Sequence, residues 1–195
     1  MIRTVSVGSV APVVAGAVLC GGASRRMGVD KATLLVQGEP MAVRVARALE
    51  LGGCRPVYAV GGGADLHRAI GLPGVADEHP GEGPLGGVIT ALAHQHGDVT
   101  AVFVVACDLP ELQPDTVRRV LDGLGGHEVA MAWTDRMEPL CAVWRVGVLA
   151  HLRAEFAQGR RSVHEAIGGL DVAFVELDEA LLRNVNTPGD LDRLR

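Results

Sequence analysis

The stretch Val13–Lys31, VVAGAVLCGGASRRMGVDK, decides how the rest of the chain is interpreted. Its first part, Val13–Cys20, is an aliphatic run of strand length, and its lack of polar alternation predicts burial on both faces. A glycine-rich loop, Gly21–Lys31, follows this run directly. In parallel α/β sheets, ligands bind beyond the carboxyl ends of the strands. The stretch therefore predicts both the fold class and the place of a ligand.

The segments after this loop alternate between strand-like and helix-like patterns. Further strands are expected at 56–60, 74–76, 99–107, 127–133, 140–144 and 172–177. Helices are expected at 40–51, 64–70, 86–95, 116–124, 147–158 and 162–167, and a last helix is expected after Asn186-Thr187-Pro188. This alternation predicts an α/β fold of three layers, α/β/α, with a Rossmann-like, mostly parallel sheet. The nearly all-apolar run 99–107 is expected near the centre of that sheet.

Length and local composition favour one domain. The 195 residues lie within the range of a single domain, and no linker or repeat divides them. Residues 1–12, which Gly8, Ser9 and Pro12 interrupt, are expected to form a flexible leader before one domain at 13–195. Leu19 precedes Cys20 where a lipoprotein signal would have a small residue, so a buried strand is preferred to a signal.

The overall composition excludes several classes of protein. A net charge of −5 argues against a general nucleic-acid binder, which usually has a basic face. The chain has no apolar run of about 18 residues, so no membrane span or membrane partner is expected. Its four cysteines show no CxxC spacing and are interpreted as reduced core residues, which suits a reducing cytoplasm.

Positive charge concentrates in the loop after the first strand. Gly21 and Gly22 leave backbone N–H groups accessible, while Arg25, Arg26 and Lys31 supply three cations within seven residues. Bare amides and cations after a buried strand predict a polyphosphate site, although the spacing matches neither the Walker A loop nor GxGxxG. Lys31 is the one lysine among 18 basic residues, which suggests that this position needs a compact ammonium group.

Two later segments offer oxygen ligands. Asp108 follows the expected central strand and precedes Leu109-Pro110, where its carboxylate is suited to Mg²⁺ bound together with substrate phosphates. Its alternative role is to cap a turn before the proline. Asn184 and Asn186 alternate, so they share one face if the chain is extended there. Asn186 is also suited to cap the last helix, and the two roles are compatible.

Weaker candidates lie on glycine-rich or basic turns. The literal GxGxxG at 81–86 follows no convincing strand and contains Glu82, so it is interpreted as a turn into a helix rather than a dinucleotide site. Asp77, just before it, is suited to a base or ribose contact. Arg160 and Arg161 follow a predicted helix end, where they either complement the helix dipole or hold a phosphate.

In order along the chain, these motifs resemble those of the molybdenum cofactor guanylyltransferases, within the wider nucleoside-triphosphate-transferase superfamily. The loop Leu19–Lys31 resembles LAGGxSxRMGxDK, Asp77 with 83–87 resembles an aspartate followed by GPLxG, and 108–110 matches D-[ML]-P. The later segments 139–140, 160–162 and 184–188 match in the same order, and the similarity extends from about Ala15 to the C-terminus.

The resemblance implies a nucleotide-diphospho-sugar-transferase-like fold and a nucleotidyltransferase activity. Such an enzyme joins GMP from GTP to the terminal phosphate of molybdenum-bound molybdopterin and releases diphosphate. The resemblance also implies Mg²⁺ as cofactor, a cytoplasmic location, and molybdoenzymes or cofactor-insertion proteins as partners.

The resemblance also assigns roles residue by residue. The nucleotide-binding residues implied are Leu19, Cys20, Gly21, Gly22, Lys31, Asp77 and Asp108; the catalytic ones are Lys31, Asp108 and Arg25; the metal ligands are Asp108 and Asn186; and the acceptor-side residues are Arg160, Arg161 and Asn184. Two positions depart from the family pattern. Cys20 replaces the usual alanine, and Gly61 stands where relatives often have an asparagine, which makes a side-chain contact at position 61 doubtful.

The residues also agree with the implied chemistry. Attack of a phosphate oxygen on the α-phosphorus needs positioning and charge neutralisation, which Lys31 and Arg25 would provide for the leaving diphosphate. The attacking phosphate is already ionised, so no general base is expected. One alternative is a cytidylyltransferase for molybdopterin or another phosphorylated acceptor, but Gly22 favours guanine because those relatives have LAAG. Another is a catalytically silent nucleotide-binding domain, although both Lys31 and Asp108 are retained.

Overall fold

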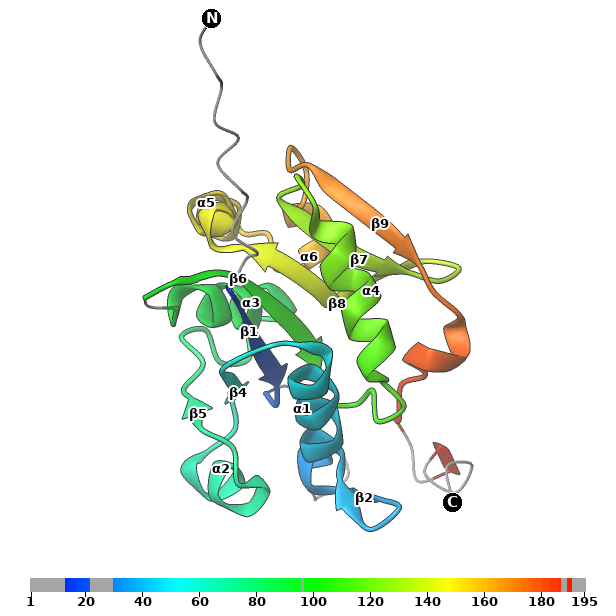
Figure 1. Cartoon of the computed structure of the whole chain (residues 1–195). Helices are drawn as coiled ribbons and strands as arrows, with labels where there is room; N and C mark the ends of the chain where they lie inside the picture. The colour runs from blue at the N-terminus through cyan, green and yellow to red at the C-terminus, as the bar shows by residue number, and fades with distance from the viewer. Residues whose placement is uncertain (1–12, 22–29, 96, 187–188, 191–195) are drawn as a thin grey trace, which may run out of the picture.

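A central sheet of seven strands organises the computed structural model, which describes residues 13–21, 30–95, 97–186 and 189–190 (Figure 1). The strands are β1 (Val13–Leu19), β4 (Val57–Val60), β5 (Gly74–Val75), β6 (Val99–Ala106), β7 (Val129–Trp133), β8 (Met137–Arg145) and β9 (Val172–Glu176). Their order across the sheet is β5-β4-β1-β6-β8-β7-β9. Strand β8 pairs antiparallel with both neighbours, and every other pairing in this sheet is parallel. The predicted mostly parallel sheet is confirmed.

Helices cover both faces of the sheet, as predicted for three layers. Helices α1 (Met41–Gly52), α2 (Ala64–Ile70) and α4 (Pro114–Leu124) pack their apolar side chains on one face. Helices α3 (Pro84–Ala93), α5 (Leu149–Ala157) and α6 (Val163–Ala166) pack on the other. Figure 1 shows α1 and α4 in front of the sheet and α3 behind it. No helix in the described ranges has both the length and the hydrophobicity needed to cross a bilayer.

The centre of the sheet is built from the two aliphatic runs that the sequence singled out. Strand β1 lies between β4 and β6, with Leu19 paired to Val60 on one side and to Ala106 on the other. Val102 and Phe103 of β6 are fully buried, because helices cover both faces of this strand. The loops after β1, β4 and β6 therefore leave the same edge of the sheet side by side, and we call it the carboxyl edge.

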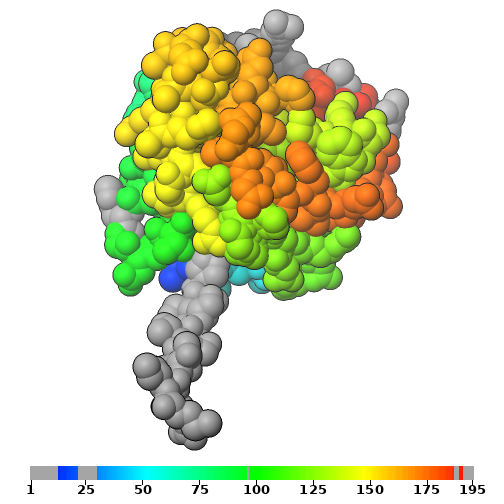
Figure 2. Space-filling model, turned by 90° about the horizontal axis from the view of Figure 1, so that it is seen from above, coloured from blue at the N-terminus to red at the C-terminus, as the bar shows by residue number. Residues whose placement is uncertain are grey.

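The opposite edge of the sheet holds the amino ends of β1, β6 and β9. In Figure 1 the arrowheads of β1, β6 and β9 point downward, toward the carboxyl edge. The view from above in Figure 2 therefore shows the amino ends of these strands, where the yellow surface of α5 and the orange surface around β9 are exposed.

A short hairpin after the first loop was missed by the sequence analysis. Strands β2 (Leu35–Val36) and β3 (Glu39–Pro40) pair antiparallel around Gln37 and Gly38, whose φ angles are 52° and 83°. Two consecutive positive φ angles are typical of the tight turns that join hairpin strands. The prediction that Pro40 begins a helix was wrong by one residue, because Pro40 is extended in β3 and α1 begins at Met41.

Other boundaries differ by a few residues. Helices α3 and α4 begin two residues earlier than predicted, at Pro84 and Pro114, because proline is favoured in the first helical turn. Strand β8 is longer than predicted and shifts register opposite β7. The short 3₁₀ helices 31–33, 146–148 and 179–182 were not predicted as such. The leader 1–12 lies outside the described residues, as does most of the predicted last helix, of which 189–190 are helical.

Candidate functional site

The carboxyl edge brings three backbone segments into direct contact. The Cys20 amide donates to the Val60 carbonyl (2.8 Å), and the Cys107 amide donates to the Leu19 carbonyl (3.2 Å). These bonds continue the strand pairing one residue beyond the strands. The first glycine-rich loop, the loop after β4 and the loop containing Asp108 therefore start from fixed and adjacent positions.

Lys31, Asp108 and Asn186 meet at this edge although they are far apart in the sequence. Lys31 Nζ lies 2.8 Å from Asn186 Oδ1 and 3.4 Å from Asp108 Oδ2, across sequence separations of 155 and 77 residues. The Lys31 and Asp108 side chains are only 14% and 21% exposed, so their charges are partly shielded from water. The structure thus brings together three residues that the sequence analysis singled out.

Local backbone contacts hold two members of this cluster. The Asp30 side chain accepts from the Ala32 amide (3.1 Å) and caps the short helix that begins at Lys31. The Val185 amide donates to the Asp108 carbonyl (2.9 Å), and the Val185 side chain is buried. Val185 is buried between two more exposed asparagines. The Asn186 side chain therefore lies outside the core, where it contacts Lys31. The same bond keeps the C-terminal segment beside Asp108.

A second part of the carboxyl edge is formed by Gly21, Gly61 and Asp77. A β-carbon at position 21 would lie 3.7 Å from Asp77 Oδ2, so this carboxylate faces the first turn of the glycine-rich loop. Gly61 has a φ of 75°, and a β-carbon there would lie 2.9 Å from the Gly21 Cα. A β-carbon at position 61 would require the Gly21 backbone to shift, and the glycine present offers no side chain to a ligand.

Asp77 is oriented by two uncharged donors. Its Oδ1 accepts from the His79 amide (2.9 Å) and lies 3.1 Å from the hydroxyl of Thr90, on α3. Thr90 is 1% exposed, and the sequence analysis missed it, because one threonine within an apolar helix gives no signal of a partner elsewhere.

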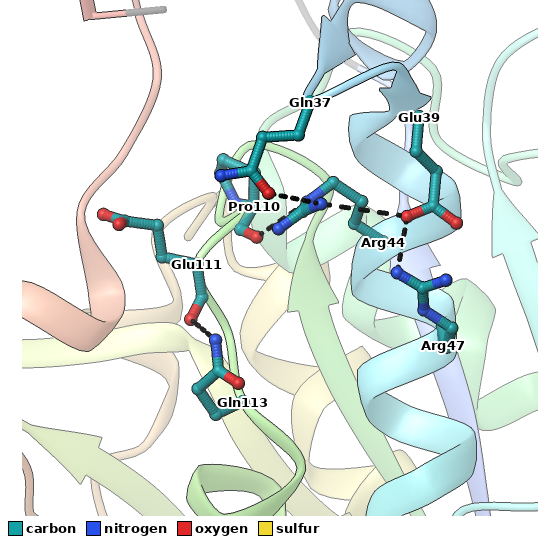
Figure 3. Close-up of polar contacts among 7 residues, drawn as sticks. All are labelled: Gln37, Glu39, Arg44, Arg47, Pro110, Glu111 and Gln113. Atoms are coloured by element: carbon teal, nitrogen blue, oxygen red, sulfur yellow. Dashed lines mark hydrogen bonds and ion pairs between the residues drawn. The ribbon is translucent and has the colours of Figure 1, made fainter. Parts of the chain in front are cut away.

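Arg44 connects the segment after Lys31 to the loop that contains Asp108 (Figure 3). Its Nε donates to the Pro110 carbonyl (3.2 Å), and its guanidinium lies 3.4 Å from Gln37 Oε1 and 3.9 Å from Glu39. Arg47, one turn later on α1, pairs with the same Glu39 at 2.7 Å. The sequence analysis missed Arg44, because an arginine on an amphipathic helix is indistinguishable from a solvated one.

The two arginines proposed for the acceptor side already have partners. Arg160 bonds to Glu155, while Arg161 pairs with Glu82 at 3.0 Å and stacks on Phe156 at 3.9 Å. Both arginine side chains are 41% exposed. The Arg161 carbonyl also accepts from the Leu85 amide, so the turn 81–86 is fastened at the start of α3, as expected for a turn into a helix.

The donor set fits Mg²⁺ held jointly with phosphates. Within the described ranges, no three His, Cys, Asp or Glu side chains gather as a metal site. Asp108 and Asn186 nevertheless present one carboxylate and one amide oxygen to the same point, which Lys31 Nζ now contacts. Magnesium characteristically takes one or two protein oxygens and completes its shell with water and substrate phosphates.

The four cysteines are buried and free, as predicted for reduced core residues. A hydrogen bond with the Cys20 thiol, together with burial, raises the pKa of Cys107 well above its ordinary value. Burial raises the pKa of Cys54 and of Cys141 to about 12. At neutral pH these three thiols stay protonated, which disfavours a nucleophilic role.

Two further predicted site residues, Gly22 and Arg25, lie outside the described residues.

Comparison with known proteins identifies the family of this chain. The MobA-like NTP transferase domain matches residues 16–172, most of the chain. The chain belongs to this family. A probable molybdenum cofactor guanylyltransferase from Opitutus terrae is 34% identical over 95% of this chain and 96% of its own. The molybdenum cofactor guanylyltransferase of Rhodobacter capsulatus is 32% identical to this MobA-like chain over 93% of this chain and 97% of its own.

The fold of this MobA-like transferase also recurs among solved structures. The Rv0371C complex with manganese from Mycobacterium tuberculosis H37Rv superimposes with a TM-score of 0.70 and 22% identity. The match covers 95% of this chain and 98% of that chain. At this identity the likeness shows the shared fold, and it agrees with the three-layer architecture described above.

Proposed function

We propose that this chain transfers GMP from GTP to the terminal phosphate of molybdenum-bound molybdopterin, with release of diphosphate. The observation that supports this proposal best is the meeting of Lys31, Asp108 and Asn186 beside Gly21 and Asp77. A cation and hard oxygen ligands on one side, with a separate carboxylate on the other, suit a nucleoside triphosphate bound across the carboxyl edge. The names of the relatives agree with this choice of substrates.

Each residue has a distinct role in the proposed reaction. Leu19, Cys20, Gly21 and Gly22 contact the nucleoside through their backbone, and the Asp77 carboxylate accepts from a donor group of the nucleoside. Lys31, together with Arg25, neutralises the phosphates, above all the negative charge that develops on the leaving diphosphate. The acceptor's phosphate oxygen attacks the α-phosphorus in line, the bond to the β-phosphate oxygen breaks, and diphosphate leaves. The attacking oxygen is already ionised, so no side chain has to remove a proton.

Asp108 and Asn186 are the residues proposed to hold Mg²⁺. When bound, the cation supplies charge neutralisation at the phosphates and helps to orient them. In this proposal Lys31 Nζ moves from the two side-chain oxygens to the phosphates of GTP. Asp108 would then exchange an ammonium partner for a divalent one, which keeps its charge compensated throughout.

The acceptor is proposed to bind on the side of Arg160, Arg161 and Asn184. Both arginines are paired with carboxylates, so an acceptor phosphate would have to compete with Glu155 and Glu82. A guanidinium group can bind a phosphate through two parallel N–H donors, which a lysine ammonium cannot. We further propose that the reaction takes place in the cytoplasm and that the product passes to molybdoenzymes or cofactor-insertion proteins.

The direct test is incubation of the protein with GTP, Mg²⁺ and molybdenum cofactor, with diphosphate release as the readout. We expect release that depends on all three components, and a matched reaction with CTP should release far less. Faster release with CTP would support the cytidylyltransferase alternative. Binding of GTP without release from any phosphorylated acceptor would support a catalytically silent domain.

A further inference from the structure

Thr90 lies behind Asp77, on the side away from Gly21. We propose that Thr90 is a positioning residue that orients Asp77 toward the nucleoside. The inference rests on the proposed function, because it assumes that Asp77 contacts a bound nucleotide. Thr90 itself is 1% exposed, so it acts through Asp77 and does not touch the ligand.

The hydroxyl of Thr90 connects three groups. Its oxygen accepts from the Glu78 amide (3.0 Å), and it lies 3.1 Å from Asp77 Oδ1 and 2.9 Å from the Gly86 carbonyl. A hydroxyl has one proton, so the two oxygens compete for it. The Gly86 carbonyl lies nearer, but the Asp77 carboxylate is the stronger acceptor because it is charged. The proton is therefore assigned to Asp77.

This bond fixes which oxygen of Asp77 faces the site. The His79 amide and the Thr90 hydroxyl both bond Oδ1, while Oδ2 lies toward Gly21. With Oδ1 held by two donors, rotation of the carboxylate would break both bonds. Oδ2 is thereby presented as an acceptor for an N–H or O–H group of the nucleoside, at no ordering cost when the ligand binds.

The Thr90 hydroxyl also orders the turn that contains Asp77. It holds the Glu78 amide next to α3, while Glu78 pairs with Arg153 at 3.6 Å on α5. Removing the hydroxyl would leave Asp77 Oδ1 with the bond from the His79 amide but without the one from Thr90, and would leave the Glu78 amide without this partner. The expected consequence is weaker nucleotide binding through a misoriented Asp77, with the rest of the fold retained.

The test is equilibrium binding of GTP with Mg²⁺ by titration calorimetry to the full chain. Thr90→Val removes the hydroxyl at nearly constant shape, and we expect the Kd for GTP to rise about tenfold. Thr90→Ser keeps the hydroxyl, and we expect a Kd within about twofold of wild type. Thr116→Val is the matched control, since Thr116 is a buried threonine (2% exposed) on α4, on the other face of the sheet, and we expect no change.

A double-mutant cycle separates positioning from a structural role. In an Asp77→Ala background, Thr90→Val should cause no further loss of GTP affinity, because the group that Thr90 orients is gone. An equal loss in both backgrounds, an equal loss for Thr90→Val and Thr90→Ser, or an unchanged Kd in folded Thr90→Val would each overturn the inference. If Thr90→Val does not fold, Thr90→Ala compared with Thr90→Ser gives the same contrast.

The outcomes distinguish this inference from the proposed function. Wild-type protein that binds GTP while Thr90→Val binds it equally well contradicts only the role of Thr90. Wild-type protein that does not bind GTP contradicts the proposed function and the inference together.

Discussion

Two aspartates at the carboxyl edge, Asp77 and Asp108, are held by different kinds of partner. Asp108 faces the ammonium of Lys31 at 3.4 Å, and Lys31 in turn contacts Asn186, from the far end of the chain. Asp77 accepts from the His79 amide, two residues away, and from the buried hydroxyl of Thr90. One carboxylate faces a cationic side chain, and the other bonds to uncharged donors.

The difference separates two tasks that a nucleotidyltransferase must perform. A carboxylate paired with a lysine can exchange that partner for a divalent ion when the phosphates draw the ammonium away, as proposed above, so Asp108 is suited to the chemical step. A carboxylate with one oxygen bonded to uncharged donors presents its other oxygen in a fixed direction, so Asp77 is suited to recognition of the nucleoside. The comparison predicts that changes at the first site reduce kcat, while changes at the second mainly raise KM.

Asp108→Asn should have the largest effect. The substitution keeps the size of the side chain but removes the charge that would compensate a bound cation. We expect kcat for diphosphate release to fall about 1,000-fold, while thermal unfolding shows that the protein stays folded. Near-normal turnover in this variant would contradict the role of Asp108 and the comparison itself.

Lys31→Ala should have the next largest effect. Loss of the ammonium removes charge neutralisation at the phosphates, and we expect kcat to fall about 100-fold with a smaller change in the KM for GTP. Lys31→Arg restores the charge but with a planar fork instead of a compact group, so it should recover only part of the activity. Full recovery in that variant would show that charge alone is sufficient.

Asp77→Asn should separate the two sites most clearly. It replaces one carboxylate oxygen by a donor, so a nucleoside donor group and the Thr90 hydroxyl can no longer both find an acceptor. We expect the KM for GTP to rise about tenfold, with kcat changed less than about threefold, in steady-state assays. A loss confined to kcat would place Asp77 in the chemical step instead.

Arg44→Ala should have the smallest effect of the four. Arg44 joins the Pro110 carbonyl to the hairpin after Lys31, so its loss would loosen the spacing between Lys31 and Asp108. We expect kcat to fall about fivefold. Arg47→Ala is the control, because Arg47 pairs with the same Glu39 but is 57% exposed, and it should remain within about twofold of wild type. An equal loss of kcat in the two variants would show that the shared contact with Glu39 matters, and not the bond from Arg44 to the Pro110 carbonyl.

Much of the site was predictable because its residues lie in local motifs. Lys31 closes a glycine-rich loop after a buried strand, Asp108 follows another buried strand, and both positions could be read from a few neighbouring residues. The hairpin 35–40 was missed because Gln37 adopts a positive φ that glycine or asparagine would have signalled more clearly. Thr90 and Arg44 were missed because their partners are distant or on other elements.

The sequence by itself determined the fold class, the loop that contains the one lysine, and the candidate residues Asp77, Asp108 and Asn186. Hydrophobic periodicity and glycine placement are local properties, so they can be read along the chain. Only the tertiary structure decided that Asn186 meets Lys31 across 155 residues, and that Thr90 stands behind Asp77. Those contacts depend on the strand order β5-β4-β1-β6-β8-β7-β9 and on the packing of α3 against the sheet. No local pattern encodes them, because they arise when crossover connections bring distant segments to one edge.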